Sequence, residues 1–357
     1  MTGNGSEVIE LAEKLKNQRQ NRYDVVVPGK DLHVTYDVGT KQIFMEVPQP
    51  GDKPPRQHNI TDWAHHQIAE KTGIPMRYYR KMQEKGKLDL LATNINEWLP
   101  SKEKRLVRVL ENNVRALLSD RYRCIDNYDI FYATLDQFNK IQEQKEFTID
   151  VQSARLTDTN MYIKATSPQL DAEIKHYKGH GEPVHGGVII TNSEVGNGAF
   201  TVKPFINVLV CSNGLVSDQI FKRVHMGRSH DIGYIEWSDK TKELEDTALW
   251  SKINDMIWNT FDLNIFAKWV DELNDIASTE IEKPEEAIDN VIKKYEIPKS
   301  RKESLLNQFT REGSPTQWGL SMAITRCAQD EENYNEQVKM EEIGAKLLKP
   351  EATIQDS

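Results

Sequence analysis

Cysteine is scarce in this 357-residue sequence, and the spacing of the few cysteines present excludes a disulfide framework. Cys124, Cys211 and Cys327 lie far apart and include no C-x-x-C pair. Small secreted domains carry an even number of conserved cysteines, and many zinc or redox motifs carry closely spaced pairs. The sequence therefore indicates ordinary thiols in a reducing compartment.

Long apolar runs are also missing. No stretch approaches the ~18 consecutive apolar residues of a membrane helix. Residues 1–20 are polar and mixed in charge, without the apolar core of a signal peptide. We therefore expect no membrane association and a cytoplasmic location.

The common catalytic motifs are absent as well. The sequence has no G-x-S-x-G, so a nucleophile elbow has no support. It has no GxxxxGK[ST] and no GxGxxG followed by a helix, so the support for nucleotide binding is weak. We predict no catalytic residue and no cofactor from motifs, and whether the protein is an enzyme stays open.

Charge is unevenly distributed along the chain. Residues 241–357 hold 14 Lys/Arg and 24 Asp/Glu, a net charge of −10, whereas the whole chain carries −9, which leaves +1 for residues 1–240. An acidic C-terminal part beside a neutral, locally basic body is compatible with nucleic-acid binding. It is equally compatible with an ordinary protein surface.

Hydrophobic periodicity predicts an α+β fold with a central antiparallel sheet, whose long hairpins are flanked by helices. We divide the chain into an N-terminal helix and β meander (1–60), an α+β core (61–240) and an acidic helical C-terminal region (241–357). Residues 104–118 fit either a helix or a strand.

Glycines concentrate in residues 185–205, around the sequence NSEVGNG. Gly196 and Gly198 permit positive φ and close approach of another chain, and Gly214 marks a second turn. Backbone N–H groups of such loops can hold an anion. The alternative is a β-hairpin turn, for which Asn-Gly is typical.

A basic segment follows this glycine-rich region. Its candidate phosphate contacts are Lys222, Arg223, His225 and Arg228. A basic strand beside a glycine turn suits a phosphate backbone. The competing interpretation is an edge strand whose charges prevent aggregation.

A second basic segment runs from Lys102 to Arg123, with seven Lys/Arg against three acids. Arg121 and Arg123 flank Tyr122, and arginines with an interleaved aromatic can pair with phosphates and stack on bases. The same arginines could instead form ion pairs within the protein.

Histidines raise the question of a metal site. The set is His176, His180, His185, His225 and His230. Zinc needs three or four ligands that converge, and this spacing matches no standard site. We predict no metal, and keep a metal-assisted hydrolase or nuclease as the alternative function.

Six segments resemble a phage- and plasmid-borne family, the domain of unknown function 932. They are WAHHQIAEKTGIPMRYYRKM, LLSDRYRCIDN, GGVIITNSEVGNGAFTVKPFINVLVCSNGL, KRVHMG, WGLSMAITRCAQD and MEEIGAKLL. The resemblance implies an accessory protein of a mobile element in a prokaryotic cytoplasm. Hairpins flanked by helices are also similar to phage single-strand annealing recombinases, which is an analogy of fold only.

Together these patterns lead to the hypothesis of a non-enzymatic nucleic-acid-binding protein, related to single-strand annealing or recombination. Single-stranded DNA is the candidate partner, and a homo-oligomer is expected. A protein-interaction factor that uses the acidic C-terminal helices is a third alternative.

Overall fold

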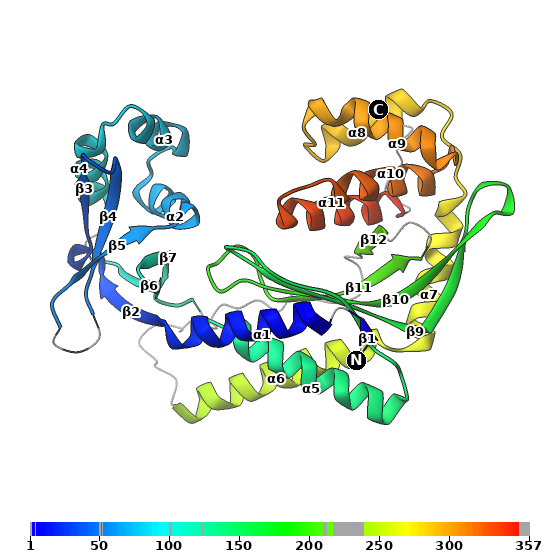
Figure 1. Ribbon diagram of the computed structural model, residues 1–357, viewed down its shortest axis with the longest axis horizontal. Helices are drawn as coiled ribbons and strands as arrows, with labels where there is room; N and C mark the ends of the chain where they lie inside the picture. Colours follow the sequence, from blue (N-terminus) through cyan, green and yellow to red (C-terminus); the bar gives the residue numbers. More distant parts are fainter. Residues whose placement is uncertain are drawn as a thin grey trace.

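Two six-stranded sheets and a C-terminal group of helices form a U-shaped molecule in the computed structural model (Figure 1). The structure describes residues 2–3, 5–49, 51, 53–99, 102–122, 124–209, 213–216 and 239–349. One sheet forms the base of the U, and the other sheet and the C-terminal helices form its two arms.

The sheet of the first arm has the order β2-β6-β7-β5-β4-β3. Its strands are β2 (Arg22–Pro28), β3 (His33–Asp37), β4 (Gln42–Val47), β5 (Arg56–Ile60), β6 (Lys104–Leu110) and β7 (Asn113–Ser119). A short 3₁₀ turn, η1 (Gly29–Asp31), connects β2 to β3. The segment that fitted either a helix or a strand is therefore a strand pair, β6 and β7.

The meander expected in residues 23–48 is only partly present. β3 and β4 form an antiparallel hairpin, but β2 pairs with β6, from Arg22 opposite Leu110 to Pro28 opposite Lys104. The boundary that we placed at residue 60 thus falls inside one sheet, because β2 to β5 share it with β6 and β7.

Three helices pack on this sheet and close its core. They are α2 (Asp62–Thr72), α3 (Met76–Glu84) and α4 (Leu88–Trp98). Thr61 caps α2 by accepting a hydrogen bond from the backbone N–H of Ala64, and Gly73 ends the helix with a φ of 68°. The buried side chains of Ile68, Tyr79 and Leu91 belong to the same core as the strands.

The base sheet has the order β1-β8-β9-β10-β11-β12. Its strands are β1 (Thr2–Gly3), β8 (Asp150–Leu156), β9 (Met161–Lys175), β10 (Gly181–Asn192), β11 (Thr201–Val208) and β12 (Asn213–Val216), with the 3₁₀ turn η2 (Tyr177–Gly179) between β9 and β10. Gly187 lies where β9 and β10 approach closely, since a Cβ there would stand 1.9 Å from the carbonyl oxygen of Ala165.

Helices cover this sheet and complete the largest core. They are α1 (Gly5–Gln20), α5 (Asn127–Lys145), α6 (Asp239–Thr260) and α7 (Leu263–Ala277). Figure 1 shows α1, α5 and α6 side by side below the sheet. The β-branched runs of β8 to β11 are buried on the face of the sheet that this helical layer covers.

The second arm consists of α8 (Pro284–Lys294), α9 (Lys302–Glu312), α10 (Gln317–Gln329) and α11 (Tyr334–Leu347), with the 3₁₀ turn η3 (Lys299–Arg301) before α9. These helices share a core of their own. A buried ion pair between Lys164 of β9 and Glu341 of α11 attaches them to the base sheet. The predicted α+β class with antiparallel hairpins and a C-terminal helical region is confirmed.

Candidate nucleic-acid interface

The NSEVG loop, residues 192–196, turns inward between the two sheets. Glu194 is 4% exposed and Ser193 is fully buried. Gly196 has a φ of 80°, and a Cβ there would stand 2.7 Å from Leu118 Cδ2. Gly198 has a φ of 106°, with open space around it. Both glycines therefore occupy conformations that other residues rarely adopt.

Hydrogen bonds within the loop use the groups that an anion would need. Ser193 Oγ donates to the carbonyl oxygen of Thr159 at 2.8 Å. The same Oγ accepts from the backbone N–H of Asn197 at 2.9 Å and from that of Val195 at 3.3 Å. Because two N–H groups already have an internal acceptor, the geometry favours the hairpin-turn interpretation over the anion site.

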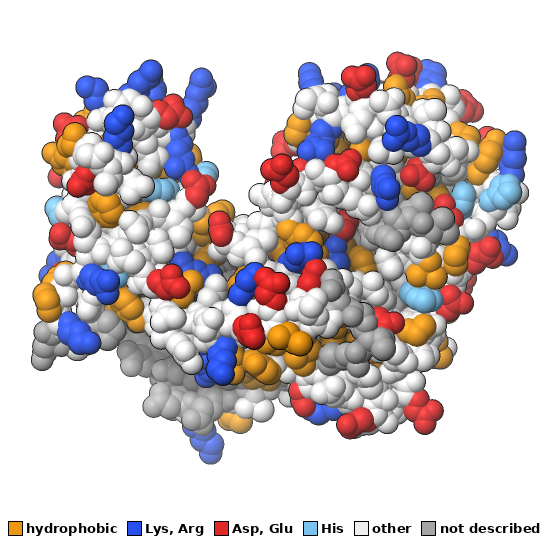
Figure 2. Space-filling model, viewed as in Figure 1, with side chains coloured by type: hydrophobic (Ala, Val, Ile, Leu, Met, Phe, Trp, Pro, Cys, Tyr) orange, Lys and Arg blue, Asp and Glu red, His pale blue; other side chains and the backbone are white. Residues whose placement is uncertain are grey.

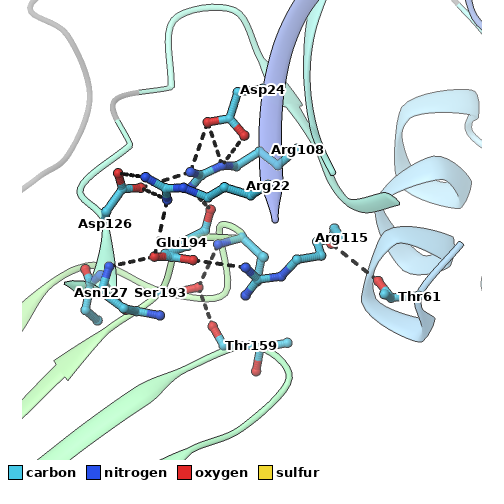
Figure 3. Close-up of polar contacts among 12 residues, drawn as sticks. Arg22, Asp24, Thr61, Arg108, Arg115, Asp126, Asn127, Thr159, Ser193 and Glu194 are labelled. Carbon is cyan, nitrogen blue, oxygen red and sulfur yellow. Dashed lines mark hydrogen bonds and ion pairs between the residues drawn. The ribbon is translucent and has the colours of Figure 1, made fainter. Parts of the chain in front are cut away.

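Around Glu194, three arginines and three carboxylates form a network that is buried at Glu194 and Arg108 and reaches solvent at Asp24 (Figure 3). Its members come from β2, β6, β7, the start of α5 and the NSEVG loop: Arg22, Asp24, Arg108, Arg115, Asp126 and Glu194. The number of arginines equals the number of carboxylates, so the network carries no net formal charge.

The contacts of Glu194 and Arg108 show how the network joins the two sheets. Glu194 accepts from Arg115 NH1 at 3.0 Å and from the backbone N–H of Asn127 at 2.6 Å. Arg108 donates from Nε to Asp24 at 3.0 Å, from NH2 to Asp126 at 2.9 Å and from NH1 to the carbonyl oxygen of Glu194 at 2.9 Å. All three guanidinium nitrogens of Arg108 therefore donate hydrogen bonds to oxygens of the protein itself.

The electrostatics of the network favour the ionised forms. Burial opposes ionisation of Asp126, but hydrogen bonds from Arg22 and Arg108 outweigh it and hold the pKa of this carboxyl below its ordinary value. Burial raises the pKa of the neighbouring Cys124 thiol to about 11, so that thiol stays protonated at neutral pH. The network is thus a structural joint, with its cations already neutralised.

Two of the predicted nucleic-acid contacts, Arg121 and Tyr122, differ in exposure. Arg121 is exposed, as a phosphate contact requires. Tyr122 is half-buried, packs against the cluster of Leu118 and Val195, and donates its hydroxyl to the carbonyl oxygen of Ser193 at 3.1 Å. Burial raises the pKa of Tyr122 to about 12. Its role in base stacking stays a prediction, and Arg123 lies outside the described residues.

The basic segment after β12 holds four of the predicted phosphate contacts. Lys222, Arg223, His225 and Arg228 all lie outside the described residues. Gly214, which precedes them, is buried, and a Cβ there would stand 2.5 Å from Phe205 Cε2. Its position supports close packing of β12 against β11.

Two histidines that were considered as metal ligands, His176 and His185, contact different partners. His176 Nδ1 lies 3.1 Å from Ser314 Oγ, and His185 Nε2 lies 3.6 Å from Asp171 Oδ1. Within the part of the chain that the structure describes, no three His, Cys, Asp or Glu side chains are grouped as a metal site requires. His225 and His230 lie outside that part.

The surface of α3 carries a basic stripe that the sequence analysis missed. Arg77, Lys81 and Lys85 recur at intervals of four, so they lie along one face of the helix and its end. All three are exposed and make no ion pair with any residue that the structure describes, and the same holds for Lys87. Tyr78, beside Arg77, is 48% exposed.

Other residues of α3 show that this exposure is selective. Tyr79 is fully buried and its hydroxyl lies 2.8 Å from His65 Nδ1, whereas Arg80 pairs with Asp62. Figure 2 shows Lys and Arg side chains gathered at the upper end of the arm that carries α3, across a deep hollow from the C-terminal arm. The spacing of four in RYYRKMQEK was the available sequence signal, since residues 71–87 hold six Lys/Arg and one acid.

Comparison with known proteins identifies the family. The chain belongs to the family described as domain of unknown function (DUF932), whose model matches residues 115–339. No curated protein and no solved structure matches the chain. In the described residues, no helix combines the length and apolarity needed to cross a membrane.

Proposed function

We propose that this protein binds nucleic acid through the exposed basic face of α3. The observation that carries the proposal is the stripe of Arg77, Lys81 and Lys85, which has no carboxylate partner among the described residues, with Tyr78 exposed beside it. Cations that are not neutralised internally are free to replace the counterions of a phosphate backbone.

The contrast with the arginine–carboxylate network around Glu194 strengthens this choice. There, each arginine already donates to a carboxylate, so binding a phosphate would require an internal ion pair to break. On α3 no such cost arises for the three stripe residues. The net charge of −9 does not oppose local binding, because charges beyond about 8–10 Å are largely screened at physiological salt.

The finer parts of the proposal rest on the sequence. Arg121 is exposed and is a second candidate phosphate contact. Annealing of single strands, self-association and an origin in a phage or other mobile element are further parts of the proposal, and they rest on the resemblance.

Fluorescence anisotropy of labelled DNA across a salt series tests the function. The probes are a 40-nucleotide single strand and the corresponding 40-base-pair duplex, each titrated with the full-length protein. We expect binding that weakens steeply as salt rises, with a slope of about −0.9 (duplex) or −0.7 (single strand) per neutralised phosphate. No binding of either probe at low salt, where electrostatics are strongest, would contradict the proposed function.

A further inference from the structure

We infer that α2 and α3 form a helix-turn-helix unit that places α3 in the major groove of duplex DNA. The inference rests on the proposed function and names its substrate, double-stranded DNA. Three observations carry it: the turn between the helices, the packing that fixes them, and the chemistry of the outward face of α3.

The turn has the length and the glycine that this motif uses. Residues 73–75 separate the two helices, and a helix-turn-helix joins its helices by three or four residues that often include glycine. Gly73 adopts a φ of 68° and donates its N–H to the carbonyl oxygens of Ala69 and Glu70. Ile74 donates to the same Ala69 oxygen at 2.9 Å, and Pro75 directly precedes α3.

Packing holds the second helix against the first. Ala69, 2% exposed, is a small residue on the inner face of α2, and Ile74 is buried in the turn that follows. Tyr79 and Met82 of α3 belong to the same core cluster as these two residues. The 2.8 Å contact between Tyr79 and His65 adds a polar link between the helices. The helix pair is therefore fixed before any ligand arrives.

The outward face of α3 has the residues that read a groove. In helix-turn-helix proteins, residues near the start of the second helix contact base edges. Arg77 and Tyr78 are the second and third residues of α3, and Lys81 follows one turn later. Arginine and lysine can donate to the O6 and N7 atoms of guanine, which the major groove exposes.

Residues at the far end of α3 fit the phosphate backbone that borders the groove. Lys85 and Lys87 are exposed just beyond the helix. Asp62, at the start of α2, is paired with Arg80, and Glu84 is the one carboxylate on α3 itself. The surface that would face DNA is thus strongly cationic. A major groove about 12 Å wide admits a single helix of this kind.

The first experiment compares strand states with matched variants. The full-length protein is titrated into a labelled 20-base-pair duplex and into one of its single strands. We expect tighter binding of the duplex, and at least ~10-fold weaker duplex binding by Arg77→Ala/Lys81→Ala. The matched control, Lys252→Ala/Lys268→Ala, removes the same charge from exposed sites on α6 and α7 and should bind like the wild type.

The second experiment identifies the groove. Methyl green, a major-groove ligand, and netropsin, a minor-groove ligand, are each added to the preformed complex with the duplex. We expect methyl green to displace the protein and netropsin to leave it bound. Selection from a randomised duplex pool should also enrich a recurring sequence with the wild type, and Arg77→Lys should relax that preference because lysine lacks the planar fork of arginine.

The outcomes separate this inference from the proposed function. Preference for the single strand, displacement by netropsin alone, or equal loss in the two double variants would overturn the helix-turn-helix inference while leaving nucleic-acid binding intact. Absence of binding to both probes would overturn both. Unchanged circular dichroism of the exposed-site variants serves as the folding control.

Discussion

The buried carboxylate of Glu194 links the two sheets of this protein. The side chain of Glu194 is 5% exposed, and it is shared between Arg115 of β7 and the first backbone N–H of α5. Its contact with Arg22 is longer, at 3.8 Å. A carboxylate in this position stabilises the fold only as long as its partners remain, because an uncompensated buried charge is costly.

Replacing Glu194 with Gln should therefore destabilise the protein. The amide keeps the volume but leaves Arg115 without its carboxylate, so we expect a loss of about 2 kcal/mol in the free energy of unfolding. Urea denaturation followed by circular dichroism measures the loss. The control is Glu10→Gln, which removes an exposed pair with Lys14 and should leave the stability almost unchanged. Equal effects of the two substitutions would contradict this account of the network.

The contribution of Asp126 to the stability of the folded protein depends on pH, and the direction of its pKa shift gives the direction of that dependence. Its pKa in the folded protein lies below its ordinary value, owing to Arg22 and Arg108. Its stabilising contribution is thus complete above the unfolded pKa of about 3.9, and is lost as the pH falls through the lower folded pKa.

Comparison with Asp126→Asn isolates this contribution. The difference in unfolding free energy between wild type and variant should be constant above about pH 5 and should narrow below about pH 4. Denaturant titrations between pH 2.5 and pH 7 measure it. A difference that widens on acidification would show that Asp126 has a raised pKa and would refute the assignment.

At the scale of elements, the local sequence pattern predicts much of the secondary structure. It does not predict which distant strands pair. The β8–β9 and β10–β11 hairpins follow from β-branched runs separated by turn residues, and the end of α2 follows from Gly73. The pairing of β2 with β6 does not follow, because nothing in the sequence near Arg22 specifies Leu110 as its partner.

The same difference between local and long-range contacts explains how much of the candidate site the sequence could predict. Arg22 and Asp126 are 104 residues apart in the sequence, so their ion pair and the burial of Glu194 appear only once the chain has folded. Tyr122 looked like a stacking residue because its sequence neighbours are arginines, yet its hydroxyl is held by the Ser193 carbonyl. The stripe on α3 is different, because spacing of four was visible in the sequence and needed only the knowledge that those positions are exposed.

A buried ion pair is one of the contacts that attach α11 to the base sheet. Lys164 Nζ lies 2.6 and 2.8 Å from the two carboxylate oxygens of Glu341. Lys164→Met should destabilise the protein by about 3–5 kcal/mol, because it leaves Glu341 buried without a counter-ion. The double variant Lys164→Met/Glu341→Leu should recover a large part of this loss.

Thermal and urea unfolding of the single and double variants measure the interaction energy between Lys164 and Glu341. Lys203→Met is the matched control, since Lys203 forms a less buried pair with Glu342 of the same helix and should cost less. A double variant as unstable as Lys164→Met alone would indicate that packing, rather than charge, dominates at this contact.

At the scale of the whole molecule, the charges that stabilise the fold lie apart from the charges that we propose bind DNA. Arginines at the joint between the sheets are neutralised by ion pairs, whereas the α3 stripe of Arg77, Lys81 and Lys85 is exposed at the end of one arm. Residues 284–347, which form the C-terminal arm, hold 9 Lys/Arg and 12 Asp/Glu, a net charge of −3. This arm is therefore weakly acidic and favours contact with DNA less than the α3 surface does.

The most direct test removes the α3 stripe from the intact protein. Duplex anisotropy is measured for wild type, for Arg77→Ala/Lys81→Ala/Lys85→Ala and for the control Lys252→Ala/Lys268→Ala/Lys293→Ala, at several salt concentrations. The account predicts that the α3 variant binds at least ~10-fold more weakly and loses about three units of salt slope, whereas the control retains both affinity and slope. Undiminished binding by the α3 variant, or equal weakening of both variants, would contradict the central claim.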